Sequence, residues 1–377
     1  MRLREAGSIE AAVRDPRSLP SLPEDAWDLL IRQGRRTNLL GHLAAALEDS
    51  GELVNVPPQP HAHLASALAL VHHQTRAVRW EARKICAALS DLAIPIVALK
   101  GMAYVLAELP NARGRMFSDI DILVPEDALA QVEGALMLNG WTTLEHDAYD
   151  QRYYRTWMHE LPPMRHMKRG TVIDVHHAIL PRTARIHADS ARMCSAAIPV
   201  AGFANLFVFQ PVDMVLHSAT HLFNEGELDK GLRDLVDLDL MLRHFARTEG
   251  FWTRLERRAT EVGLERPLYY GLHHAVRILD SPVPPATRAT IGSWGPGLPL
   301  GALMDALFAR ALRPNHPSAD DGLTRLARWL LYVRGHWLRM PAHLLVYHLA
   351  RKAIKGHDEK SSASDRPVLR DEPGAVG

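Results

Sequence analysis

Two aspartates separated by one residue lie in a short apolar run that is typical of a buried strand. Asp119 and Asp121 alternate there with Ile120, Ile122 and Val124. Side chains two residues apart in a strand point to the same face, so we expect the two carboxylates to project side by side. Adjacent carboxylates repel each other and are costly to desolvate unless a cation neutralises them. We expect that cation to be Mg²⁺, or Mn²⁺ in its place, because such ions prefer oxygen ligands and are often shared with substrate phosphates.

A third acid follows in a second apolar run, in which Asp174 lies between Ile173 and Val175. On a neighbouring strand, Asp174 can align with the pair and act as a metal ligand or as the general base beside an incoming hydroxyl. Solvated acids at a strand edge would give the same Asp-x-Asp pattern. The strand that ends at Lys100-Gly101 and the later Val-Ile-Asp-Val run favour the catalytic interpretation.

The segments around these acids have the pattern of a small α+β core. Apolar runs with β-branched residues predict strands, and Pro-Glu-Asp after Val124 predicts the start of a helix. The predicted strands cover 94–99, 120–124 and 141–144, and a predicted hairpin joins 164–168 to 171–175. With helical segments at about 102–109 and 125–139, they predict a small mixed β-sheet with helices on one side.

Helical periodicity dominates on both sides of this core. The predicted helices cover about 23–48 and 61–92 before it, and 211–223, 229–246, 250–261, 266–279, 300–311 and 321–353 after it, with a Pro-rich connection at 282–299. We therefore expect an α+β chain whose core is flanked by N-terminal and C-terminal helical regions. The expected boundaries are 1–92, 93–200 and 201–355, with a disordered tail at 356–377.

The composition narrows the class of protein and its location. Of the 377 residues 47% are hydrophobic and 23% charged, and the net charge of +1 gives no strong nucleic-acid signature. Cys86 and Cys194 form neither a disulfide framework nor a Cys-x-x-Cys motif. The N-terminus lacks an apolar run of signal-peptide length, and we find no window of about 18 uncharged apolar residues. We therefore expect a cytoplasmic protein.

The ordered motifs resemble a known family. The matching segments are Leu99-Lys-Gly101, Arg115, Asp119-Ile-Asp-Ile-Leu-Val124, Pro125-Glu-Asp and Ile173-Asp-Val-His-His177. Together they resemble the uncharacterised bacterial nucleotidyltransferase family, a distant branch of the DNA polymerase beta-like superfamily, over about residues 20–345. The resemblance implies an active site at one edge of a mixed sheet, followed by a helical domain. It also implies that Asp119 and Asp121 are the paired metal ligands and Asp174 the third acid.

The resemblance also implies an NTP co-substrate, with ATP favoured, and a set of nucleotide-binding residues. Gly101 falls at the turn where the superfamily usually grips the triphosphate with a Gly-Ser pair, and Lys100-Gly101 stands in place of that pair. Lys100 could contact phosphate as a point charge, and Gly101 allows close backbone approach. Arg115 could bind phosphate with two hydrogen bonds or only solvate a loop, and Ser118 lies directly before the Asp-x-Asp pair.

Several further residues are candidates for substrate contact. His159 and Arg165 belong to a polar cluster that could shape the acceptor pocket or be a plain loop. His176 is two residues from Asp174, so it should share the face of that acid. His217 and His221 lie one helical turn apart, a spacing that could chelate a metal.

Two sequence patterns in the predicted C-terminal helices allow more than one interpretation. Arg233, Asp234 and Asp237 could join the two histidines in an interhelical polar network, which we favour over a metal site. Residues 323–355 combine aromatic, leucine and arginine side chains, a pattern that could contact a membrane surface. Internal packing of the apolar stripe is the favoured interpretation, so membrane contact is not expected.

These patterns favour an enzyme that transfers a nucleoside monophosphate from an NTP to a hydroxyl, with pyrophosphate leaving. The acceptor, a small molecule, peptide or protein, is not specified by the sequence. The alternatives are a non-catalytic module that binds nucleotide or peptide in a biosynthetic cluster, and a metal-dependent phosphohydrolase that uses His217, His221 and nearby acids.

Overall fold

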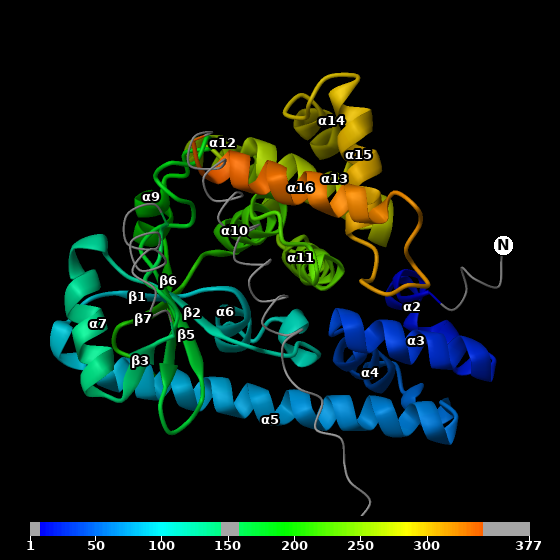
Figure 1. The fold of residues 1–377 in the computed structure, drawn as a ribbon, viewed down its shortest axis with the longest axis horizontal. Coiled ribbons are helices and arrows are strands. Elements are labelled where there is room, and N and C mark those ends of the chain that lie inside the picture. The colour runs from blue at the N-terminus through cyan, green and yellow to red at the C-terminus, as the bar shows by residue number, and fades with distance from the viewer. Residues whose placement is uncertain (1–7, 145–157, 342–377) are drawn as a thin grey trace, which may run out of the picture.

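The computed structural model describes residues 8–144 and 158–341, and it combines a seven-stranded mixed sheet with many helices (Figure 1). The sheet lies at the left of Figure 1, the long helix α5 (Pro58–Ala88) runs beneath it, and the C-terminal helices lie at the upper right. The expected α+β class is confirmed. The expected tail at 356–377 lies outside the described residues.

Four helices of the described residues precede the sheet. They are α2 (Ile9–Arg14), α3 (Glu24–Thr37), α4 (Leu40–Asp49) and α5, with short 3-10 turns at Pro16–Ser21, Leu53–Asn55 and Ser90–Leu92. The predicted stretch 23–48 is divided at Asn38, whose left-handed backbone (φ 56°) ends α3. Helix α5 begins three residues earlier than predicted because Pro58 occupies its first turn, where a missing N–H costs no helical hydrogen bond.

The strands are ordered β3-β4-β5-β2-β1-β7-β6 across the sheet. Their bounds are β1 Ile96–Ala98, β2 Ile120–Leu123, β3 Trp141–Thr143, β4 Met164–His166, β5 Val172–His176, β6 Ile198–Pro199 and β7 Leu206–Val208. Strand β2 runs parallel to β5 and antiparallel to β1, and β1 runs parallel to β7. The helix predicted at 211–223 is observed at Pro211–Asn224, whereas strand β7 just before it was not predicted; its apolar residues pair with β1.

The register of β2 and β5 separates apolar from acidic side chains. Asp121 pairs with Asp174, and Ile122 pairs with Val175. Because side chains alternate along a strand and paired residues share a face, the two aspartates lie on one face and the two apolar residues on the other. Ile122 and Val175 are fully buried, which fixes the register, since a slip of one residue would turn the acids toward the apolar face of the sheet.

Short helical segments connect the strands. They are α6 (Lys100–Leu106), α7 (Leu129–Leu138), α9 (Ser190–Ser195) and the 3-10 turns Pro110–Arg113 and Glu126–Ala128. Helix α6 begins directly after β1 and packs against β2 and α5, while α7 packs against β3. The turn from β1 into α6 is thereby held beside the acidic face of β2.

Up to residue 341, seven helices follow the sheet. They are α10 (Pro211–Asn224), α11 (Gly231–Phe245), α12 (Phe251–Val262), α13 (Glu265–Leu279), α14 (Pro285–Gly292), α15 (Leu300–Ala311) and α16 (Thr324–Arg339). The predicted Pro-rich connection contains α14, which starts at a proline in its first position. The predicted helix 321–353 is interrupted after Arg339, because Met340 precedes Pro341 and takes the extended backbone that this position favours. Its predicted part at 342–353 lies outside the described residues.

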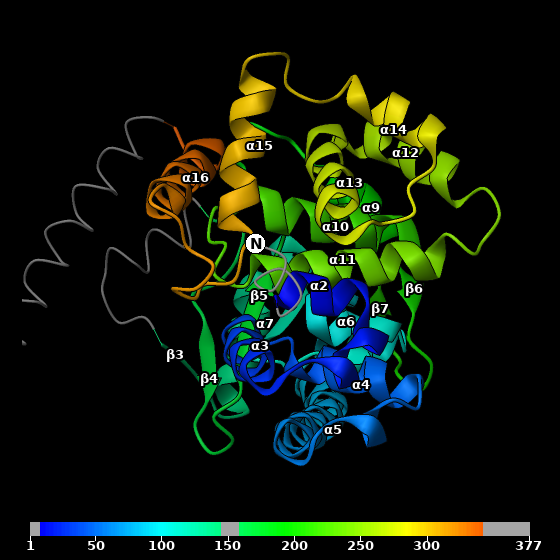
Figure 2. The same cartoon turned by 90° about the vertical axis from the view of Figure 1, so that its right-hand side faces the viewer.

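Helix α11 joins the C-terminal helices to the first half of the chain. It contacts α10 and α13 on one side, and α3 and the Pro110–Arg113 turn on the other. Figure 2 shows α11 between the later helices above and α3, α4 and α5 below. None of the described helices is long and apolar enough to cross a lipid bilayer.

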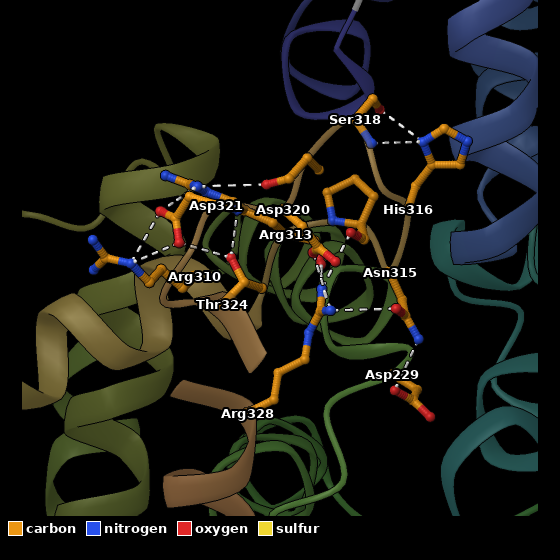
Figure 3. A network of polar contacts seen from close by, with 12 residues as sticks. Asp229, Arg310, Arg313, Asn315, His316, Ser318, Asp320, Asp321, Thr324 and Arg328 are labelled. Atoms are coloured by element: carbon orange, nitrogen blue, oxygen red, sulfur yellow. Dashed lines mark hydrogen bonds and ion pairs between the residues drawn. The ribbon is translucent and has the colours of Figure 1, made fainter. Parts of the chain in front are cut away.

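Polar contacts fix the connection between α15 and α16 (Figure 3). Asp321 accepts a hydrogen bond from Thr324 Oγ1 at 3.0 Å at the start of α16. Arg328 Nη1 donates to Asn315 Oδ1 at 3.3 Å, and Asn315 Nδ2 donates to Asp229 Oδ1 at 3.2 Å. The α15–α16 connection is thus tied to the segment before α11, which also contributes to the candidate site.

A buried histidine in the C-terminal helices should make stability depend on pH. His274 stacks on Phe223 at 5.5 Å between ring centroids and contacts Tyr270 and Phe308. Burial lowers the pKa of His274 from 6.5 to about 3, with smaller contributions from His273 and Arg277. The unfolded chain therefore binds a proton that the folded chain excludes, and stability falls as the pH drops below 6.5.

We predict that His274→Phe removes this contribution. Relative to wild type, the variant should gain about 1.4 kcal/mol per pH unit between roughly pH 6 and 4. Chemical unfolding at several pH values measures the difference. His72→Gln, at an exposed site on α5, should leave the wild-type slope unchanged. Equal slopes for wild type and His274→Phe would contradict the assignment.

Candidate active site

The three predicted acids line one cavity of about 420 Å³. Asp121 lies in β2 and is buried, and its register partner Asp174 lies in the adjacent parallel strand β5. Asp119 is exposed and directly precedes β2, where it accepts a hydrogen bond from Ser118 Oγ at 2.9 Å. The structure therefore brings together the Asp-x-Asp pair and the third acid that the sequence pattern selected.

Lys100 contacts the acid at the centre of this group. Its Nζ lies 2.9 Å from Asp121 Oδ1, and it is the first residue of α6. Lys100 has a left-handed backbone (φ 46°), which is unusual for a residue with a side chain and is found where a functional geometry is enforced. Lys100 was expected to contact phosphate, whereas here it forms an ion pair with a carboxylate.

His176 bridges two acids. Its Nε2 lies 3.2 Å from Asp121 Oδ1, and its Nδ1 lies 3.1 Å from Glu160 Oε2. Burial lowers the pKa of His176, but Glu160 and the hydrogen bond to Asp121 outweigh it, and the net pKa is raised. His176 was correctly expected on the face of Asp174, since the two are two residues apart in one strand.

The two central acids have opposite pKa shifts. For Asp121, burial favours the neutral form, but Lys100 and His176 hold its pKa far below the usual range. For Asp174, burial together with Asp121 and Glu160 raises the pKa from 3.8 to about 7. Lys100 and His176 thus offset the negative charge of Asp121. At Asp174, repulsion from neighbouring carboxylates adds to the effect of burial and raises its pKa.

The side chains fit a hard divalent cation. Asp174 Oδ1 is buried and makes no hydrogen bond to any described residue, although buried carboxylate oxygens are normally satisfied. Together with Asp119 and Asp121 it supplies the oxygen ligands that Mg²⁺ or Mn²⁺ prefers. These three residues would hold the ion, and an ion there would satisfy the orphaned oxygen.

Gly101 shapes the cavity wall through packing. A Cβ on Gly101 would lie 2.7 Å from Phe117 Cδ1 and 3.2 Å from Arg115 Nε. Both contacts are with the loop that leads into Asp119, so any side chain at position 101 would displace that loop. Gly101 is therefore required by the packing of protein side chains, and its expected role in phosphate binding stays a prediction.

Arg115 belongs to a buried polar network. It forms an ion pair with Asp237, its Nη1 lies 3.6 Å from Asp234 Oδ1, and it lies over the ring of Tyr104 at 5.4 Å. Asp237 also lies 3.6 Å from His42 Nε2. Asp234 and Asp237 of α11 do form a buried polar network, but its partners are Arg115, expected to bind phosphate, and His42, instead of the expected His217 and His221. Arg115 still lines the cavity.

The remaining histidine and arginine candidates lie in different places. His159 is buried and lines the cavity, whereas Arg165 is exposed in β4 and does not line it. His217 is buried against Phe209 with a pKa lowered to about 3, mainly by burial. His221 lines the cavity, but its Nδ1 lies 2.6 Å from Glu225 Oε1.

This placement weakens the phosphohydrolase alternative. Within residues 8–144 and 158–341, His217 and His221 join no group of three metal-ligating side chains. His217 faces an aromatic ring and His221 is paired with a carboxylate, so the helical spacing of the two histidines does not produce a metal site here.

The second wall of the cavity was not found from the sequence. It comes from the end of α10, the segment before α11, the first turn of α11 and the end of α16, and it consists of the acids Glu225, Glu227, Asp229 and Asp234 and the cations Lys230, Arg233 and Arg339. Of these residues the sequence had singled out Arg233 and Asp234, as members of a polar network. Glu160 was missed as well. The only local signal was the run Asn224-Glu-Gly-Glu-Leu-Asp-Lys230, whose charges fall between two helices.

Acids on neighbouring strands, cations beside them and a cavity that both line are the features of an enzyme that transfers phosphorus-containing groups. Residues 23–280 match the model of a family described as uncharacterised nucleotidyltransferase, and the chain belongs to that family. No curated protein and no solved structure matches the chain. The expected membership of an uncharacterised nucleotidyltransferase family is thus confirmed, while the DNA polymerase beta-like superfamily stays a prediction.

We predict that Gly101→Ala destabilises the protein by about 1–3 kcal/mol, because the added methyl overlaps Phe117. The matched control is Gly134→Ala in α7, where a Cβ meets no atom within 4 Å. That change should stabilise the helix by about 0.5–1 kcal/mol. Urea unfolding of both variants measures the contrast, and stabilisation by both substitutions would show that Gly101 has no packing role.

Proposed function

We propose that this chain transfers a nucleoside monophosphate from an NTP, with ATP as the favoured donor, to an acceptor hydroxyl and releases pyrophosphate. Asp119, Asp121 and Asp174 would hold Mg²⁺ or Mn²⁺. The bound ion would neutralise charge on the phosphates and the leaving group. The observation that carries the proposal is the register of Asp121 with Asp174, which places an unpartnered carboxylate oxygen beside the Asp-x-Asp pair.

The proposed reaction is one displacement at the α-phosphorus. The acceptor oxygen forms a bond to the α-phosphorus, the bond from that phosphorus to the bridging oxygen of the leaving group breaks, and pyrophosphate departs. The acceptor proton needs a base, and Asp174 is the candidate because its Oδ1 makes no hydrogen bond to a described residue. Asp174 could instead serve only as a metal ligand.

Cationic side chains support the binding of an anionic donor. Lys100 extends into the cavity beside Asp121 and would offset triphosphate charge on that side. Arg115 acts as a fixed part of the wall, since Asp237 already holds its guanidinium. Lys230 and Arg233 lie in the same cavity and could contact the donor or the acceptor.

Label transfer tests this proposal. With Mg²⁺ and a cell extract as the source of acceptors, label should transfer from [α-³²P]NTP and not from [γ-³²P]NTP. Asp121→Asn should reduce transfer by at least about 100-fold, because it removes a ligand charge from the site. Asp127→Asn, at an exposed site just after β2, is the matched control and should retain activity.

Transfer of the γ label would indicate phosphoryl transfer instead of nucleotidyl transfer. Undiminished transfer by Asp121→Asn would remove the proposed mechanism.

A second candidate is a module that binds a nucleotide without turning it over. The ion pair between Lys100 and Asp121 favours it, because a lysine there competes for the carboxylate that would bind a cation. Calorimetry separates the two. NTP binding with Mg²⁺ and no label transfer to any acceptor extract would support the binding module.

A further inference from the structure

Three further side chains meet at one end of the cavity. One ring nitrogen from each of His159 and His176 and a carboxylate oxygen of Glu160 all lie within 4.8 Å of one another. Backbone hydrogen bonds fix this arrangement, because Leu161 N donates to Val175 O at 2.8 Å and His177 N donates to His159 O at 2.8 Å. The segment that carries His159 and Glu160 is therefore held beside the end of β5.

The ring of His159 has no role in the proposed reaction, and its burial is unexplained by packing alone. Only 6% of its surface is exposed, and its Nδ1 is buried without a hydrogen bond to any described residue. Its ring lies 5.3 Å from the ring of His176. An imidazole nitrogen that is buried without a partner needs an explanation such as a bound ion.

The orientation of His176 suits a metal ligand. Its Nδ1 faces Glu160 Oε2 at 3.1 Å, and its Nε2 faces Asp121 Oδ1 at 3.2 Å. With a cation on Nδ1, the Nε2–H would still donate to Asp121. Histidine ligands in proteins commonly donate their second ring nitrogen to a carboxylate in this way.

We propose that His159, Glu160 and His176 form a second cation site, for a borderline transition metal such as Zn²⁺. Two imidazoles and one carboxylate are a ligand set that zinc accepts with a further position open to water or substrate. The carboxylates of Asp119, Asp121 and Asp174 form an all-oxygen set, which suits Mg²⁺. The two sites therefore select different ions within one cavity.

A second His/His/acid group in the described residues serves as a comparison. It consists of His273, His274 and Asp305. Asp305 is already paired with His273 at 2.9 Å and with Arg277, and His274 is stacked among aromatic rings. This group is therefore expected to bind no metal.

Cobalt binding tests the proposal with the full chain. Metal-stripped protein is titrated with Co²⁺ alone, and its visible absorption bands report ligand binding. Wild type should bind one equivalent, which Zn²⁺ displaces. Glu160→Gln and His159→Ala should each weaken binding at least tenfold. Glu160→Gln keeps nearly the same side-chain shape, so it tests the proposed ligand set even if His159→Ala fails to fold.

The controls are His273→Ala and Asp119→Asn, both of which should keep wild-type Co²⁺ bands. Absence of bands in wild type, their survival in Glu160→Gln, or their loss in either control would overturn the site. The experiment contains no nucleotide, so its failure is distinct from failure of the proposed nucleotidyl transfer.

Discussion

Repulsion between the paired carboxylates of β2 and β5 governs the chemistry of the cavity. Asp121 and Asp174 are register partners, so the same hydrogen bonds that form the sheet hold their side chains together. Lys100 and His176 both contact Asp121, and Asp174 Oδ1 has no such contact. The low pKa of Asp121 and the pKa of Asp174 near 7 follow from this unequal distribution of positive charge. A cation shared by the acids would relieve the repulsion.

The surrounding elements keep this costly arrangement in place. The left-handed turn at Lys100 aims its ammonium at Asp121, and Gly101 leaves space for the loop that leads into β2. Arg115, in that loop, is paired with Asp237 of α11, which links the acidic strand to the C-terminal helices. Functional sites commonly retain such strain and like-charge contacts, which the rest of the fold offsets.

The sequence predicted those parts of the site that depend on local periodicity. The period of two in β2 and β5 identified Asp119, Asp121, Asp174 and His176, since alternation alone places them on one face. Glu160 and Glu225 were missed because they reach the cavity only through tertiary packing. Strand β7 was missed because three apolar residues before a proline-led helix carry no distinctive pattern, and their parallel pairing with β1 spans more than 100 residues. Arg115 was predicted to bind phosphate because its acidic partner, Asp237, lies on a helix that is far away in the sequence.

Thermal unfolding of wild type and Asp174→Asn, in EDTA and then in Mg²⁺, tests the central claim most directly. In EDTA the variant should be more stable than wild type by about 1–2 kcal/mol at pH 8, because it removes one of two repelling charges. Mg²⁺ should stabilise wild type and leave the variant nearly unchanged. Two results would contradict a shared cation site at the β2–β5 carboxylates. One is a variant that is less stable than wild type in EDTA; the other is a variant that Mg²⁺ stabilises as much as it stabilises wild type.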